Sequence, residues 1–212
     1  MAKTTSYPAD LQIDYPAKLD RVSTFFRLIW AIPAFVLVTL ISGTDMTIYV
    51  NKAGEQISQS GGGVVAGLFG ATLLMILFRQ RYPRWWFDFA LELNRFSTRV
   101  SAYLLLLTDK YPSTVEKQTV HLDLTYPDAK KDLNRWLPLV KWFLAIPHYV
   151  VLMVLSIVAV LATIIAWFAI LFTGRYPKDL FDFVVGVTRW GWRVTAYALL
   201  LTTDKYPPFS LK

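Results

Sequence analysis

The chain has no cysteine, only two histidines and few charged residues among its 212 positions. The lack of cysteine excludes a disulfide framework, thiolate metal sites and a cysteine nucleophile, and two histidines nearly exclude a multi-histidine metal centre. Charged residues make up 17% of the chain, whereas soluble domains contain about 25%. No glycine-rich phosphate loop of the P-loop or dinucleotide type occurs either. We therefore expect neither an enzyme nor a cofactor.

Apolar and aromatic side chains dominate instead. Hydrophobic residues make up 55% of the chain, and the mean hydropathy is +0.40. The longest stretch without an acidic or basic residue has 33 residues, from Trp142 to Gly174, and shorter apolar stretches cover Leu28–Ser42 and Val64–Phe78. Apolar runs of about 18 residues or more are typical of membrane spans. The net charge of +7 then indicates anchoring at anionic lipid headgroups of the inner membrane face, and not nucleic-acid binding.

The sequence contains an internal repeat. Arg81–Thr108 and Arg175–Thr202 are identical at 15 of 28 aligned positions, and both continue into Asp-Lys-Tyr-Pro. Chance does not produce that density of identities. We therefore divide the chain into repeat one, residues 1–118, and repeat two, residues 119–212.

The repeats differ by an insertion of 20 residues in repeat one, within the polar, glycine-rich segment Ser42–Gly63. A polar loop cannot satisfy its backbone inside lipid, so the insertion must lie at a membrane surface. The matching point in repeat two must then lie at a surface too, which makes the long apolar run a helical hairpin. This reasoning predicts four membrane spans, at about Val22–Ser42, Gly62–Phe78, Leu137–Ser156 and Ile157–Thr173.

The basic residues predict the orientation of these spans. Of 22 lysines and arginines, only Lys52 lies in the insertion. The positive-inside rule therefore predicts a multi-pass protein with both termini in the cytoplasm. The two repeats share one orientation, which predicts a pseudo-twofold axis along the membrane normal.

A further helix is predicted after each Arg-Tyr-Pro, because Pro83 and Pro177 suit helix starts. These helices cover about Arg84–Leu107 and Lys178–Leu201, and each is apolar and tryptophan-rich with a single charged stripe. That pattern is typical of an amphipathic helix lying in the membrane interface. The fold class expected is thus an all-α membrane protein with four transmembrane and two interfacial helices in two parallel repeats.

Basic side chains on or near these helices are candidates for contact with lipid phosphates or with acidic groups of a partner. The six candidates are Arg95, Arg99, Arg189, Arg193, Arg27 and Lys141. The plainer alternative is pairing within the helix and snorkelling to the membrane surface. If the helices instead lie between spans, their charges would be buried and paired.

Short strands are predicted outside the membrane. Ala9–Pro16 and Thr119–Pro127 alternate apolar and polar residues, so they could pair with each other or pack on the interfacial helices. Within the insertion, Thr47–Val50 and Gln56–Ser58 around a turn at Asn51–Glu55 predict a small hairpin. His148, with no second histidine nearby, is predicted to pack or form a hydrogen bond.

Several motifs together carry a resemblance: Ala-Ile-Pro-His-Tyr at Ala145–Tyr149, Thr-Gly-Arg-Tyr-Pro at Thr173–Pro177 and Asp-Lys-Tyr-Pro-Pro-Phe-Ser-Leu at Asp204–Leu211. The chain resembles a bacterial domain-of-unknown-function family of small integral membrane proteins. The resemblance implies a bacterial envelope setting and implies no known activity or site residues. Together with the predicted spans and the positive-inside rule, it predicts the bacterial cytoplasmic membrane. Repeat one departs from the family pattern at Ala34, where the family has histidine, and at the insertion.

We therefore expect a non-enzymatic accessory or scaffold subunit that packs against lipids and other membrane protein subunits. The alternative is a small transporter or channel with a path along the repeat axis, although few polar residues are available to line one. A membrane enzyme is the third hypothesis, and it lacks a nucleophile or metal site.

Overall fold

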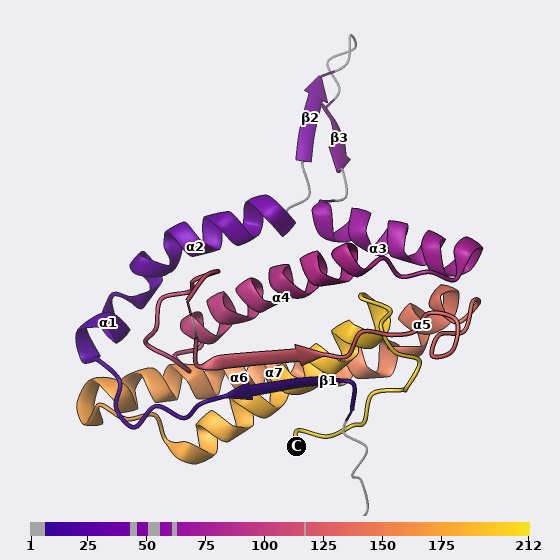
Figure 1. Cartoon of the computed structure of the whole chain (residues 1–212). Helices are drawn as coiled ribbons and strands as arrows, with labels where there is room; N and C mark the ends of the chain where they lie inside the picture. The colour runs from indigo at the N-terminus through magenta and orange to yellow at the C-terminus, as the bar shows by residue number, and fades with distance from the viewer. Residues whose placement is uncertain (1–6, 43–45, 51–55, 61–62, 117) are drawn as a thin grey trace, which may run out of the picture.

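The computed structural model describes residues 7–42, 46–50, 56–60, 63–116 and 118–212, and this part of the chain is mostly helical (Figure 1). Its helices are α1 (Arg21–Phe25), α2 (Arg27–Ser42), α3 (Val64–Leu74), α4 (Arg84–Leu104), α5 (Pro138–Leu144), α6 (Ile146–Thr173) and α7 (Lys178–Ala198). A π-helical turn, Met75–Arg79, extends α3. Its strands are β1 (Ala9–Ile13), β2 (Met46–Val50), β3 (Gln56–Ser60) and β4 (Val120–Leu124).

Helix α6 corrects the predicted membrane topology. It runs unbroken for 28 residues, so the hairpin predicted between Leu137–Ser156 and Ile157–Thr173 is wrong. No proline, glycine or polar run interrupts its backbone ladder at Ser156, whose hydroxyl donates to the Met153 carbonyl at 2.8 Å. Among the described helices, α6 is the one long and apolar enough to cross a membrane.

The matching apolar run of repeat one is divided by the insertion. Its two pieces, α2 and α3, follow one another along the top of Figure 1, and the hairpin projects from their junction. Both pieces are shorter apolar helices. Four transmembrane helices are therefore not supported by the described part of the chain.

The two amphipathic helices form where the sequence predicts them. Pro83 and Pro177 cap α4 and α7, which are each 21 residues long. Each lies between a strand and an apolar helix: α7 between β1 and α6, and α4 between β4 and α2. Their apolar faces build the core, with Phe87 and Leu91 from α4 and Phe181 and Val184 from α7 all buried.

The two predicted strands outside the apolar runs do pair. β1 and β4 are antiparallel, with Leu11 opposite Leu122, and these two side chains point into the core. Each strand packs on the amphipathic helix of the other half of the chain, β1 on α7 and β4 on α4. The two halves therefore share one interwoven core.

The hairpin predicted in the insertion is also present. β2 pairs antiparallel with β3, with Met46 opposite Ser60 and Val50 opposite Gln56. The turn predicted at Asn51–Glu55 lies outside the described residues.

The described surface has two contrasting faces. On α6, the buried positions His148, Ala159, Ala162, Ala166 and Ile170 follow one helical stripe against α7. The rest of its circumference is apolar and exposed, including Met153, Ile157, Leu161, Ile165 and Phe172. We call α2, α3 and α6 the apolar layer, because α2 and α3 also expose large apolar side chains. The outward face of the β1–β4 sheet instead carries Asp14, His121 and Asp123, which are each more than half exposed.

Candidate functional site

Arg27, the first residue of α2, is buried in an ion pair. Its Nη2 bonds Asp109 in the loop after α4, and its Nη1 donates to the Thr108 carbonyl at 2.7 Å. The guanidinium also lies 4.1 Å from the ring centre of Tyr103. The side chain is only 2% exposed, so it does not snorkel to a surface.

Lys141 makes the same arrangement at the corresponding position. Its Nζ lies 2.7 Å from Asp204 and donates to the Thr203 carbonyl at 2.8 Å. The ammonium is 5.2 Å from the ring centre of Tyr197. Burial lowers the pKa of Lys141, and the neighbouring Asp204 opposes that shift.

These two ion pairs fasten the start of each long apolar segment to the Asp-Lys-Tyr-Pro loop that follows each amphipathic helix. Asp109 and Asp204 also accept backbone N–H bonds, from Asp20 at 2.7 Å and from Asn134 at 2.5 Å. The two cations are among the residues predicted from the sequence, and the two aspartates are not. The sequence contains a pattern that could have identified them, because each aspartate is the first residue of an Asp-Lys-Tyr-Pro motif that occurs twice.

The four arginines of the amphipathic helices point to backbone carbonyls of nearby segments. Arg95 and Arg189 donate through Nε to Leu122 of β4 at 3.1 Å and to Leu11 of β1 at 2.7 Å. Arg99 and Arg193 donate to the carbonyls of Ser113 and Ser210, in the loops after α4 and α7. The charged stripes therefore face the sheet and the loops, and contact of these arginines with lipid or a partner stays a prediction.

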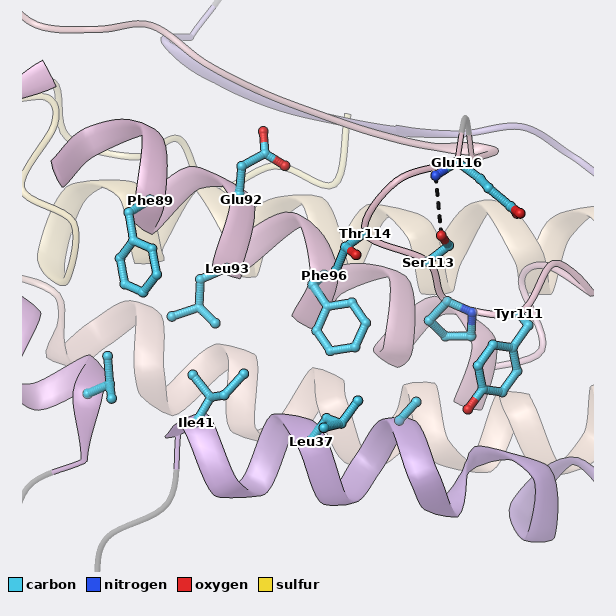
Figure 2. A pocket seen from close by; sticks show the side chains of 13 residues that line it. Leu37, Ile41, Phe89, Glu92, Leu93, Phe96, Tyr111, Ser113, Thr114 and Glu116 are labelled. Carbon is cyan, nitrogen blue, oxygen red and sulfur yellow. Dashed lines mark hydrogen bonds between the residues drawn. The ribbon is translucent and has the colours of Figure 1, made fainter. Parts of the chain in front are cut away.

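A large groove opens between α2 and α4 (Figure 2). Its volume is about 940 Å³. Figure 2 shows Leu37 and Ile41 of α2 facing Leu93 and Phe96 of α4 across it. Tyr111 and the following loop close one end. The size falls in the range of ligand sites, about 300–1,000 Å³. Most of the residues that line the groove are apolar. Its polar lining residues are Glu92, Ser113, Thr114 and Glu116.

The corresponding place beside α6 is filled. The His148 ring is fully buried and stacks on Phe209 of the C-terminal tail, with ring centres 4.0 Å apart. Trp190 of α7 donates its indole N–H to Nδ1 of His148 at 3.1 Å. His148 therefore packs and forms a hydrogen bond, as predicted.

Residues 136–210 match a family described as a domain of unknown function (DUF4389). The match covers α5, α6, α7 and most of the tail, including His148 and the Lys141–Asp204 pair. It agrees with the resemblance to an uncharacterised domain family expected from the motifs. No curated protein and no solved structure is significantly similar to the chain.

The described residues contain no group of three or more histidine, cysteine, aspartate or glutamate side chains that could hold a metal ion. What the described part of the chain offers is an apolar layer, two buried ion pairs and an open, mostly apolar groove of about 940 Å³.

Proposed function

We propose that the protein is a non-enzymatic membrane protein, an accessory or scaffold subunit held in the lipid by its apolar layer. The observation that carries this proposal is the exposure of α6. Only 17% of its most apolar 18-residue window is buried. A core helix of a soluble protein would be mostly buried, whereas an apolar helix exposed around most of its circumference requires lipid or protein partners.

The position of β1 indicates how the layer lies in the membrane. Leu11 bonds Arg189 in the middle of α7, and the Tyr15 hydroxyl donates to the Tyr176 carbonyl at 2.5 Å, just before α7 begins. Further along the chain, the Leu19 N–H donates to the carbonyl of Gly174, at the end of α6. The segment that begins with β1 therefore follows α6 along its length.

This parallel course makes a crossing by α6 costly. If α6 crossed the hydrocarbon, the exposed Asp14, His121 and Asp123 of the sheet would lie at membrane depth. An ionised aspartate near the bilayer centre costs about 2.5–3.5 kcal/mol. We therefore propose that α2, α3 and α6 lie within one leaflet, roughly parallel to the surface, and that the sheet faces water.

Basic and aromatic side chains at both ends of the layer support contact with lipid headgroups. Lys18, Arg21 and Arg175 gather near the end of α6. Trp85 and Trp136 lie toward the opposite end, and they are 67% and 66% exposed. Tryptophan is favoured at the headgroup level and basic residues bind anionic lipids, and both preferences support a position at the cytoplasmic face of a bacterial inner membrane.

The transporter alternative is not proposed. It needs several crossing helices, and the described residues include one candidate. The pseudo-twofold repeat remains part of the proposal, because matched sequence segments make matched contacts at Arg27–Asp109 and Lys141–Asp204.

Impermeant cysteine labelling tests the orientation, since the chain has no cysteine of its own. Lys131→Cys and Asp179→Cys place exposed thiols before α5 and after α6. Labelling of spheroplasts and of inverted vesicles should find both thiols on the same side, and thiols on opposite sides would overturn the flat orientation.

Isolation in mild detergent followed by mass spectrometry tests the scaffold role. Stoichiometric partner proteins are expected, and a chain that purifies alone would exclude the scaffold role.

A further inference from the structure

The two halves of the chain differ in what fills the space beside their apolar helices. Repeat alignment places Ala34 opposite His148, Phe96 opposite Trp190 and Thr114 opposite Phe209. It also places Glu92 opposite Gly186, and Glu116 opposite Leu211. Phe96 is a smaller ring than Trp190 and lacks its indole N–H, and each of the other four differences removes a ring or introduces a polar group in the first half.

In the second half, the C-terminal tail fills the space. The Phe209 ring centre lies 4.0 Å from that of His148 and 5.5 Å from that of Trp190. Leu211 follows against α7, where a Cβ added to Gly186 would lie 2.8 Å from the Leu211 carbonyl oxygen. The glycine thus permits the close approach of the tail backbone.

In the first half, no described segment fills the corresponding space as the tail does in the second half. Ala34 and Thr114 supply no ring, and Glu116 carries a charge where the tail has Leu211. The groove of about 940 Å³ remains. Unfilled apolar space forfeits dispersion contacts for the side chains that line it, so an apolar occupant would be bound favourably.

The polar contacts around the groove differ from those that hold the tail, and they disfavour an extended peptide there. Arg189 donates through Nη1 to the Leu211 carbonyl at 3.2 Å. Its counterpart Arg95 uses Nη1 to bond Glu92 at 2.5 Å. Glu92 stands in the place of the glycine that admits the backbone, and its carboxylate holds the Nη1 group of Arg95, which corresponds to the group that Arg189 uses to bind the tail.

We infer that this groove binds the acyl chain of a membrane lipid. A hydrocarbon chain needs no hydrogen-bond donor, and it fits walls made of Leu37, Ile41, Leu93 and Phe96. The groove is continuous with the exposed apolar surface, since Leu37 and Phe89 line it while being 52% and 48% exposed. The inference rests on the proposed lipid-facing layer, which brings acyl chains to the mouth of the groove.

Photo-crosslinking of the full chain in nanodiscs tests this inference. The probe is a phospholipid with a diazirine in its acyl chain, and mass spectrometry maps the labelled residues. We expect labels on Leu93 and Phe96 inside the groove and on Met153 of the lipid-facing layer. Thr114→Phe restores the ring that the second half uses as a plug, and it should reduce groove labelling severalfold while leaving Met153 labelling unchanged.

Val115→Phe is the matched control, because Val115 is 91% exposed and does not line the groove. Leu37→Trp, which narrows the groove from α2, is the second blocking variant. Two results would overturn the inference and leave the lipid-facing layer intact. The first is label on Met153 with no label on the groove residues. The second is groove labelling that neither blocking variant reduces. Absence of label from Met153 as well would overturn the proposed function. Displacement of groove labels by the peptide Tyr-Pro-Pro-Phe-Ser-Leu would identify a peptide site and reject the acyl chain.

Discussion

The ammonium of Lys141 lies 2.7 Å from a carboxylate oxygen of Asp204, and the lysine side chain is fully buried. Lys141 belongs to α5 and Asp204 to the loop after α7, so the contact joins the two ends of repeat two. Arg27 and Asp109 make the corresponding contact in repeat one. Both pairs hold the start of an apolar segment next to the end of its amphipathic helix.

Removal of one partner of this pair should destabilise the fold strongly. Asp204→Ala leaves the Lys141 charge buried and unpaired, which costs about 3–5 kcal/mol. Replacement of both residues by apolar ones, Lys141→Met with Asp204→Leu, should recover most of that loss. Denaturant unfolding in detergent micelles measures both. Asp88→Ala is the control, because its partner Arg84 is 67% exposed and such pairs contribute at most about 1 kcal/mol. Equal losses in Asp204→Ala and Asp88→Ala would contradict the prediction.

Two glycines of α7 should respond to alanine in opposite directions. At Gly191, an added Cβ meets no atom within 4 Å, so Gly191→Ala should stabilise the helix by up to about 1 kcal/mol. At Gly186, the added Cβ would lie 2.8 Å from the Leu211 carbonyl, so the tail must move. We expect Gly186→Ala to lower the melting temperature and to speed digestion of the tail by carboxypeptidase. A tail equally protected in both variants would show that it does not rest on Gly186.

Tyr82 should make stability fall in alkaline solution. Burial raises its pKa from 10.0 to about 12, which means that the folded state favours the neutral phenol. The stabilisation is complete below pH 10 and is lost as the pH rises through 12. Tyr82→Phe also loses the bond of the hydroxyl to the Leu200 carbonyl, at 3.0 Å, so it should be less stable at neutral pH. Its unfolding free energy should decline less than that of the wild type over this pH range, and parallel declines would refute the assignment.

Removal of the insertion should leave the fold of the rest of the chain intact. Replacement of Asp45–Gln59 by a short Gly-Ser linker should leave the melting temperature near the wild-type value, because α6 shows that the matching segment needs no hairpin. If the hairpin docks a partner protein, co-purifying proteins should be lost while the fold persists. Partners recovered at wild-type yield would exclude that role.

Local patterns in the sequence were sufficient to predict the helices and strands in which apolar and polar residues alternate with a clear period. The alternation in Ala9–Pro16 and Thr119–Pro127 predicted β1 and β4, and the charged stripes after Pro83 and Pro177 predicted α4 and α7. These patterns are visible in sequence because residues on one face of a helix or strand are close along the chain. The hairpin of the insertion was predictable for the same reason.

The error in α6 arose from an assumption about a distant segment. If the insertion of repeat one marks a membrane surface, a turn is expected at the matching point of repeat two. Nothing near Ser156 favours a turn, and the helix continues through it. An inserted loop thus identifies a position at which one repeat tolerates extra residues. It does not require a break in the helix at the matching position of the other repeat.

The sequence by itself determined the apolar character, the amphipathic helices, the two short strands before the apolar segments and the cations at the start of each apolar segment. Only the tertiary structure decided which carboxylate each cation meets, that each strand packs on the helix of the other half, and that the tail fills one groove and leaves its counterpart open. The physical reason is the separation of the interacting residues along the chain. Periodicity depends on neighbours within a few residues, whereas ion pairs such as Lys141–Asp204 depend on how distant segments pack. The orientation proposed for α6 depends on the same long-range packing, because it follows from a polar strand that lies beside an apolar helix.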